Sequence, residues 1–273
     1  MSYQALYRKY RSQRFDDMVG QEVVSKTLKN AISTHQISHA YLFSGPRGTG
    51  KTSAAKIFAK AINCPNQKDG EPCNTCDICL SVTNGSLEDV IELDAASNNG
   101  VDEIREIRDK STYAPSRAQY KVYIIDEVHM LTTGAFNALL KTLEEPTENV
   151  VFVLATTEIQ KIPATILSRV QRFAFRAISA TDISHHLAEI LTIEHVAFET
   201  EALDLIATAA DGGMRDALST LDQALSFSEA GLSTDDALLV TGAISKQALS
   251  AYVSAIAQGN VREALAQLDL IFN

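Results

Sequence analysis

The chain has 273 residues, of which 45% are apolar, and its formal net charge is −10. This composition predicts a large buried core and excludes a disordered chain, and without a run of about 20 apolar residues the sequence predicts no membrane span. The acidity is C-terminal, since residues 1–177 carry 21 Lys/Arg and 20 Asp/Glu whereas residues 178–273 carry 3 and 14, so no long-range positive field draws the chain to nucleic acid.

Short apolar runs of buried-strand length alternate with helical patterns through the first two-thirds of the chain. Before them, the basic residues 1–15 lack the apolar middle section of a secretory signal, which predicts a cytoplasmic protein. The predicted strands are residues 40–44, 89–93, 121–126, 150–156 and 172–176, and the predicted helices between them are 21–32, 51–62, 101–110 and 134–145. This alternation predicts an α/β fold with a parallel five-stranded sheet and helices on both faces.

After Arg176 the strand signal ends, and helix-sized segments separated by Gly, Ser, Thr and Asp caps follow. We therefore expect three domains: an α/β domain over residues 1–177, a small helical domain over 178–242, and the beginning of another helical domain over 243–273. We expect the chain to stop inside this third domain.

The segment GPRGTGKT matches the phosphate-binding loop pattern, and it lies between a predicted strand and a predicted helix. Its glycines let successive N–H groups face phosphates, and the following helix adds its positive end. We expect Lys51 to bridge the β- and γ-phosphates of ATP and Thr52 to offer its hydroxyl to Mg²⁺. An ordinary glycine-rich turn is the alternative. The predicted nucleotide-binding residues here are Gly45, Pro46, Arg47, Gly48, Thr49, Gly50, Lys51, Thr52 and Ser53.

Two acidic residues end the third predicted strand, where ligand-facing groups of an open α/β sheet lie. We expect Asp126 to hold Mg²⁺ through water and Glu127 to orient or deprotonate the attacking water. Merely solvated carboxylates are the alternative. His129 has two interpretations: it couples the site to a partner, or it is a core or helix-start histidine, which we favour.

Two further groups are candidates for contact with the γ-phosphate. Thr156 and Thr157 end the fourth predicted strand, although threonine is common at such ends. Arg215 opens a helix in the acidic part of the chain and could reach the nucleotide when the domains close. Its alternative is a surface ion pair with Asp211 or Asp216.

All four cysteines fall in one window with the spacing C-x8-C-x2-C-x2-C, at Cys64, Cys73, Cys76 and Cys79. Such spacing lets four thiolates converge on one ion and predicts a structural zinc module over residues 64–79. A disulfide pair and an iron–sulfur cluster are the alternatives.

Together these blocks resemble the gamma/tau subunits of bacterial DNA polymerase III, the AAA+ ATPases of the sliding-clamp loader. The resemblance runs from YRKYRSQRFDDMVGQ through the phosphate loop, IELDAAS, YKVYIIDEVHMLTTGAFNALLKTLEEP and LATTEIQKIPATILSR to GGMRDALSTLDQA, and the cysteines between two of these blocks are particular to this family. Two departures are Ser12, where the family usually has Pro, and Val170, where it usually has Cys. Ser12 leaves the backbone on the adenine side less rigid.

The resemblance implies further site residues. Arg169 matches the arginine finger that reaches the γ-phosphate bound by the neighbouring subunit, Thr157 matches sensor 1, and Arg215 matches sensor 2. The segment that lines the adenine pocket contains Tyr7, Arg11 and Val19. The helical parts become a lid domain and the beginning of a collar domain.

The resemblance also implies a function: an ATPase motor that works in a ring of related subunits, pentameric with the full-length chain. It opens the sliding clamp and loads it on primer–template DNA, and it does not itself polymerise DNA. Ser97 to Val101 are the expected DNA-contacting segment. Alternatives are an ATP-sensing scaffold with little hydrolysis and another nucleic-acid motor of the AAA+ class. We expect a cytoplasmic, nucleoid-associated protein, and a monomer for this chain alone.

Overall fold

The computed structural model describes residues 4–228, 231–243 and 246–272, which fold as two compact units. One unit holds residues 10–179 together with 212–215, and the other holds the residues up to 9 together with 180–211 and 216 onward. The division differs from the expected boundary after residue 177 in two ways. The N-terminal turn packs with the helical unit, and residues 212–215 pack with the α/β unit.

The α/β unit is built on a five-stranded sheet in the order β2-β3-β4-β1-β5, and every neighbouring pair is parallel. The predicted sheet is thereby confirmed. Its strands are β1 (Ala40–Ser44), β2 (Val90–Asp94), β3 (Lys121–Asp126), β4 (Val150–Thr156) and β5 (Gln171–Ala174). Three match the predicted ranges, whereas β2 lies one residue later than predicted, and β5 begins one residue and ends two residues earlier than predicted. Beyond β5, Phe175 N still donates to Ser44 O at 2.7 Å.

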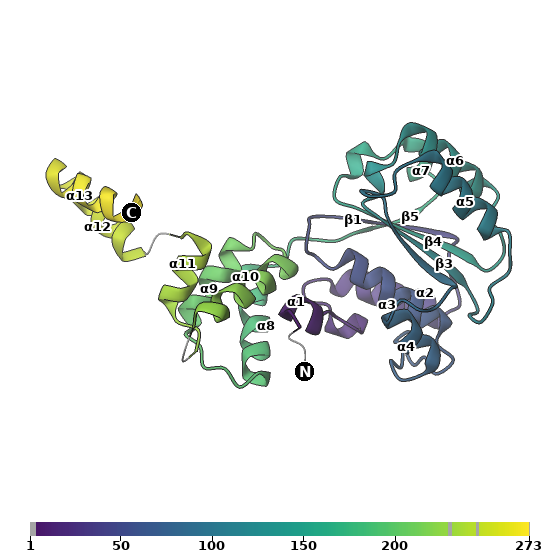
Figure 1. Cartoon of the computed structure of the whole chain (residues 1–273), viewed down its shortest axis with the longest axis horizontal. Helices are drawn as coiled ribbons and strands as arrows, with labels where there is room; N and C mark the ends of the chain where they lie inside the picture. Colours follow the sequence, from purple (N-terminus) through teal and green to yellow (C-terminus); the bar gives the residue numbers. More distant parts are fainter. Residues whose placement is uncertain (1–3, 229–230, 244–245, 273) are drawn as a thin grey trace. The chain divides into compact units, whose positions relative to one another are not determined.

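Helices cover both faces of this sheet (Figure 1). Alternate residues of β1 face opposite sides, so Tyr41 and Phe43 pack in one apolar cluster and Leu42 packs in the other. The first cluster includes residues of α2 (Glu22–Ser33) and α3 (Lys51–Asn63), and the second includes residues of α5 (Val101–Ser111), α6 (Thr133–Glu144) and α7 (Ala164–Leu167). Shorter elements are η1 (Phe15–Asp17), α4 (Asp77–Thr83), η2 (Val128–Met130) and η3 (Ile159–Lys161).

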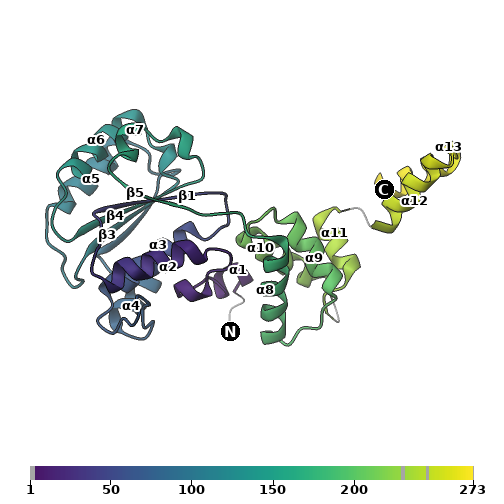
Figure 2. The same ribbon diagram turned by 180° about the vertical axis from the view of Figure 1, so that it is seen from behind.

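The second unit is helical (Figure 2). Lys9, at the end of α1 (Leu6–Lys9), forms a 2.6 Å ion pair with Glu194, next to α8. Gly242, with φ 63°, ends α11, and the predicted boundary at 243 adjoins residues 244–245, which lie outside the described residues. No helix of the described residues has the length and apolarity needed to cross a bilayer. The other helices of this unit are α8 (Ala180–Ile193), α9 (Thr200–Ala209), α10 (Met214–Phe227, from Asp216 onward), α11 (Thr234–Thr241), α12 (Lys246–Ala257) and α13 (Val261–Phe272).

Candidate nucleotide and metal sites

The phosphate loop connects the carboxyl end of β1 to the beginning of α3. Gly45 has φ 149°, and a Cβ on it would lie 2.3 Å from Phe175 O, so only glycine fits at this turn. Ala54 N is the first N–H of α3 that donates to a main-chain carbonyl, and it donates to Gly50 O at 2.8 Å. The N–H groups at the front of the helix therefore have no acceptor within it, which is the condition for binding an anion.

Lys51 is buried at the centre of this loop, with 6% of its surface exposed. Its Nζ donates to Gly45 O at 2.9 Å and to Pro46 O at 2.7 Å. Burial lowers the pKa of Lys51, and the nearby carboxylates of Glu127 and Asp126 oppose that effect. A desolvated ammonium held only by carbonyl oxygens gains when a phosphate replaces them.

Asp126, at the end of β3, meets the beginning of α3. Its Oδ2 accepts a 2.6 Å hydrogen bond from Thr52 Oγ1, and its Oδ1 accepts one of 3.0 Å from Glu127 N. The two residues predicted to hold Mg²⁺ from separate parts of the sequence are thus in direct contact. A hydroxyl and a carboxylate are the oxygen donors that this ion takes, so the pair fits it.

Glu127 has a left-handed backbone with φ 47°, which is uncommon for a residue with a side chain. Its Oε2 accepts from Thr157 Oγ1 at 3.1 Å and from Thr157 N at 3.3 Å. These bonds form because β3 and β4 are neighbours in the sheet. The predicted water-activating carboxylate and the predicted sensor threonine are therefore joined.

His129 contacts the same group. Its side chain is 6% exposed, and its Nδ1 lies 3.3 Å from Glu127 Oε2 and 3.0 Å from Thr156 Oγ1. Its Nε2 lies 3.3 Å from Glu158 Oε1. The side chain of His129 is thus largely covered and has polar neighbours, and its role stays open between the two interpretations. Sequence reasoning missed these contacts, which depend on the pairing of two strands.

Two predicted arginines lie beside the phosphate loop. Arg11 Nε donates to Ser53 Oγ at 3.0 Å, and Arg215 N lies 3.5 Å from Gly48 O. Burial lowers the pKa of Arg11, Glu92 and Asp126 raise it, and Arg215 lowers it further. Both guanidinium groups therefore belong to the electrostatic surroundings of the loop.

The other residues expected at the adenine differ in their surroundings. Val19 is half-buried and follows Met18, whose methyl group lies 3.0 Å from the point where a Cβ on Gly50 would stand. Tyr7 belongs to the helical unit, where its hydroxyl accepts a 3.1 Å hydrogen bond from Arg8. Its place beside adenine stays a prediction.

Arg169 follows α7 and is bonded within its own part of the α/β unit. Its guanidinium donates to Glu144 Oε1 and to Thr165 O, both at 2.7 Å, and to Ser168 Oγ at 3.2 Å. None of these partners belongs to the phosphate loop of the same chain, and about a third of the side chain is exposed. Its use as a finger toward a second subunit stays a prediction.

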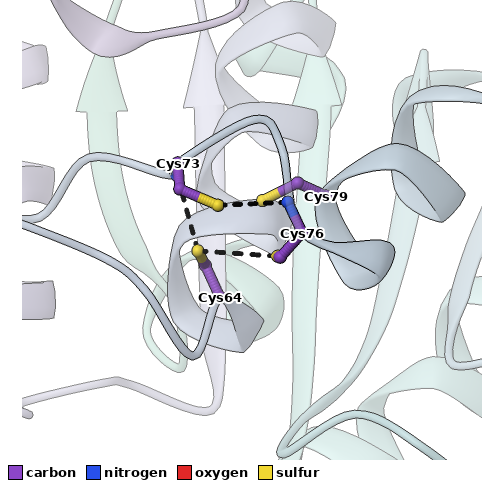
Figure 3. A group of neighbouring side chains, drawn as sticks. All are labelled: Cys64, Cys73, Cys76 and Cys79. Atoms are coloured by element: carbon purple, nitrogen blue, oxygen red, sulfur yellow. Dashed lines mark hydrogen bonds between the residues drawn. The ribbon is translucent and has the colours of Figure 1, made fainter.

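The four cysteine sulfurs converge at the end of α3 and the beginning of α4 (Figure 3). All four Sγ atoms lie within 4.8 Å of one another, and those of Cys64 and Cys76 are 3.9 Å apart. Four sulfurs 2.3 Å from a zinc ion form a tetrahedron with edges of about 3.8 Å. Main-chain N–H groups point at the thiols, with Cys76 N 3.3 Å from Cys73 Sγ and Cys73 N 3.4 Å from Cys64 Sγ. The four residues fit zinc in donor type, number and spacing.

The thiols differ in acidity. Burial raises the pKa of Cys64 and of Cys79. At Cys73, hydrogen bonds from Thr75 and Cys76 N outweigh burial and lower the pKa to about 6. One thiolate is thus available at neutral pH, and a bound cation favours deprotonation of the others.

Comparison with known proteins shows which family this chain resembles. The family model described as DNA polymerase III, delta subunit, matches residues 20–179, more than half of the chain. The model described as DNA polymerase III clamp loader subunit, ATPase lid domain, matches residues 182–230. A solved structure of the Thermotoga maritima RuvB Holliday junction branch migration motor aligns with a TM-score of 0.61 over 90% of this chain and 79% of that chain, at 18% identity. That likeness supports the fold alone.

Curated relatives give the same result. DNA polymerase III subunit tau of Bacillus subtilis is 61% identical over 269 residues, which are 98% of this chain and 48% of the relative. The tau subunit of Escherichia coli is 47% identical over 269 residues, which are 98% of this chain and 42% of the relative. The chain thus spans about half the length of these relatives. With its AAA+ fold and both family models matched, the chain belongs to the gamma/tau family of DNA polymerase III clamp-loader subunits.

Proposed function

We propose that the chain binds and hydrolyses Mg-ATP at the edge of the sheet where β1, β3 and β4 end. The observation that carries this proposal is the 2.6 Å contact between the hydroxyl of Thr52 and the carboxylate of Asp126, beside the buried ammonium of Lys51. A hydroxyl, a carboxylate and an ammonium together match the ends of a metal-bound triphosphate.

Each residue of the site has a distinct task in this proposal. Thr52 and Asp126 would hold Mg²⁺, which when bound would supply positive charge to the phosphates. Lys51 exchanges a carbonyl contact for a phosphate oxygen. Glu127 orients the attacking water and accepts its proton, and Thr157 holds the carboxylate of Glu127 until substrate arrives.

Hydrolysis in this proposal is completed by a second subunit. Arg169 of one subunit would reach the γ-phosphate bound by its neighbour, after leaving the 2.7 Å ion pair with Glu144. Because Arg169 and the bound γ-phosphate belong to different subunits, hydrolysis would depend on whether the ring is assembled. The partly exposed side chain of Arg169 supports this proposal.

The wider function follows from the family. We propose that ATP binding orders a ring of related subunits, likewise pentameric with the full-length chain, so that it opens the sliding clamp and holds primer–template DNA. Helices 178–242 would act as the lid, with Arg215 as sensor 2, and 243–273 would begin a collar. The segment Ser97 to Val101 leads into α5, whose first residue is Val101, and would meet DNA phosphates through main-chain N–H groups at the beginning of that helix.

We also propose that the four cysteines hold a structural zinc ion. Metal analysis of purified protein is expected to give one zinc per chain, and a value near zero would refute it. The nucleotide proposal is tested by titration calorimetry with Mg-ATP and by phosphate release. Wild-type protein that binds no Mg-ATP would contradict it.

A further inference from the structure

The cysteine module (residues 64–79) contacts the N-terminal segment (residues 11–19) at several points within the α/β unit. The four cysteines could come together at the end of α3 without touching this segment, so these contacts call for an explanation. They come from a buried carboxylate, which a tight turn places, and from a buried lysine. Each is a polar group that the module or α3 directs at the main chain of the segment.

The turn is formed by Lys68, Asp69, Gly70 and Glu71. Lys68 and Glu71 exchange main-chain hydrogen bonds of 3.1 and 2.9 Å, and the two central residues have φ 53° and 78°. This Asp-Gly turn suits a two-residue hairpin. A Cβ on Gly70 would lie 2.5 Å from Lys29 O, so the tip of the module is pressed against α2.

The turn directs Glu71 at the segment. Its side chain is 5% exposed, and its two carboxylate oxygens accept hydrogen bonds of 3.0 Å from Phe15 N and Asp16 N. Lys29 Nζ lies 3.3 Å from the same carboxylate. Glu71 therefore binds the first N–H groups of η1, in the way that an anion binds a helix N-terminus.

A buried lysine of α3 makes the second connection. Lys60 is 1% exposed, and its Nζ donates to Gln13 O at 3.1 Å, to Gln13 Oε1 at 2.8 Å and to Asn74 Oδ1 at 2.6 Å. Asn74 Nδ2 also donates to Gln13 O at 3.2 Å. Since Asn74 lies between Cys73 and Cys76, the knuckle that would surround the metal is bonded directly to the segment.

The other side of the segment meets the phosphate loop. Arg11 donates to Ser53, and Met18 packs against Gly50, as described above. The segment is thus held on one side by Glu71 and Asn74 and presents its other side to the candidate nucleotide site. This arrangement gives the cysteine module a path to that site.

We propose that the cysteine module positions the N-terminal segment against the nucleoside part of ATP, with Glu71 and Asn74 as positioning residues. This inference rests on the proposed function, because it takes the segment as the adenosine side of the site. A bound metal fixes Cys73 and Cys76 and hence Asn74 between them. Loss of Glu71 or of the metal frees the segment and weakens binding of nucleotides, while the phosphate loop keeps its affinity for phosphates.

Calorimetric titration with two ligands tests this proposal. Mg-ATP contacts both parts of the site, whereas Mg-tripolyphosphate contacts the phosphate loop alone. In Glu71→Ala, the Kd for Mg-ATP is expected to rise about tenfold or more, and the Kd for Mg-tripolyphosphate to stay within about twofold. Glu71→Gln keeps one acceptor, so its Kd for Mg-ATP should lie between that of wild type and that of Glu71→Ala. Glu88→Ala removes an exposed carboxylate beyond α4 and should change neither Kd.

An unchanged Kd for Mg-ATP in Glu71→Ala would overturn the inference, as would equal losses for the two ligands, which would mean general damage to the loop. Wild-type protein that binds neither ligand would instead refute the proposed function.

A second variant guards against misfolding of the first. Asn74→Gly keeps the left-handed backbone, φ 57°, and removes the side chain that bonds Lys60 and Gln13. Amide hydrogen exchange of residues 13–18 is expected to accelerate by about tenfold or more in this variant and after chelation of the metal. Chelation of Asn74→Gly should add little, since both changes act on the same bond. Unchanged exchange in the variant would overturn the inference.

Discussion

Replacing Lys51 with methionine separates nucleotide binding from folding. Methionine keeps most of the aliphatic length but removes the ammonium that donates to Gly45 O and Pro46 O. We expect Mg-ATP binding to weaken by roughly a hundredfold and the stability of the nucleotide-free protein to change little.

The magnitude follows from the surroundings of the ammonium. At an effective dielectric constant of about 20, two unit charges 4 Å apart attract by about 4 kcal/mol. Exchanging one carbonyl contact for a phosphate oxygen costs about 1 kcal/mol, which leaves about 3 kcal/mol, or roughly a hundredfold in Kd. Because burial lowers the pKa of Lys51, the folded chain holds the charged form less favourably than water does. Removing that charge therefore costs little folding free energy.

The assay is calorimetric titration with Mg-ATP, together with thermal unfolding without nucleotide. Lys110→Met is the matched control, because Lys110 lies on α5 and pairs with Glu106 on the surface at 2.6 Å, away from the phosphate loop. It should bind Mg-ATP like wild type. A Kd for Lys51→Met within about threefold of wild type would show that the Lys51 ammonium does not hold the phosphates. A fall in Tm of more than about 5 °C would mean that the lost binding reflects damage to the fold.

Three further predictions concern hydrolysis and stability. Glu127→Gln should bind Mg-ATP normally, and its rate of ATP hydrolysis, measured by phosphate release, should be at least about a hundredfold lower than that of wild type. A wild-type rate would exclude Glu127 as the base. Arg169→Ala should also bind Mg-ATP normally but lose the hydrolysis stimulated by DNA and clamp in the assembled complex, and equal stimulation would refute its use as the finger. Asp89 accepts N–H bonds from Ser116, Ala118 and Arg117, which outweigh burial and hold its pKa below 3.8. Its stabilising effect is therefore present above that pH and is lost as the pH falls through the folded value. Asp89→Asn should lose about 2 kcal/mol in urea unfolding at pH 7, and the difference from wild type should shrink toward pH 2; a constant difference would contradict this.

The sheet was predictable because its inner strands are continuous apolar runs. Leu42 and Phe43 lie on opposite faces, yet both are fully buried, as expected for a sheet with helices on both sides. The short α4 was missed because its seven residues place Ile78, Leu80 and Val82 at every second position, and this is not the spacing of a helix. The segment up to Lys9 was assigned to the α/β domain because nothing local indicates its ion pair with Glu194.

Some residues of the candidate site could likewise be predicted from local sequence patterns, and others could not. The phosphate loop and the acidic end of β3 are local patterns, so Lys51 and Asp126 could be found from sequence. The surroundings of Glu127 depend on which strand lies next to β3, and that order is not written in any local pattern. Glu71 and Lys60 read as ordinary surface charges in the sequence, because their partners on residues 13–16 are more than forty residues away.

We propose that assembly with other subunits completes the candidate nucleotide site. The most direct measurement is the rate of ATP hydrolysis by the chain alone and in the complex with its partner subunits, with and without the sliding clamp and primed DNA. We expect slow hydrolysis by the chain alone and a rate that rises when clamp and DNA are added to the complex. A rate that is the same under all of these conditions would contradict it.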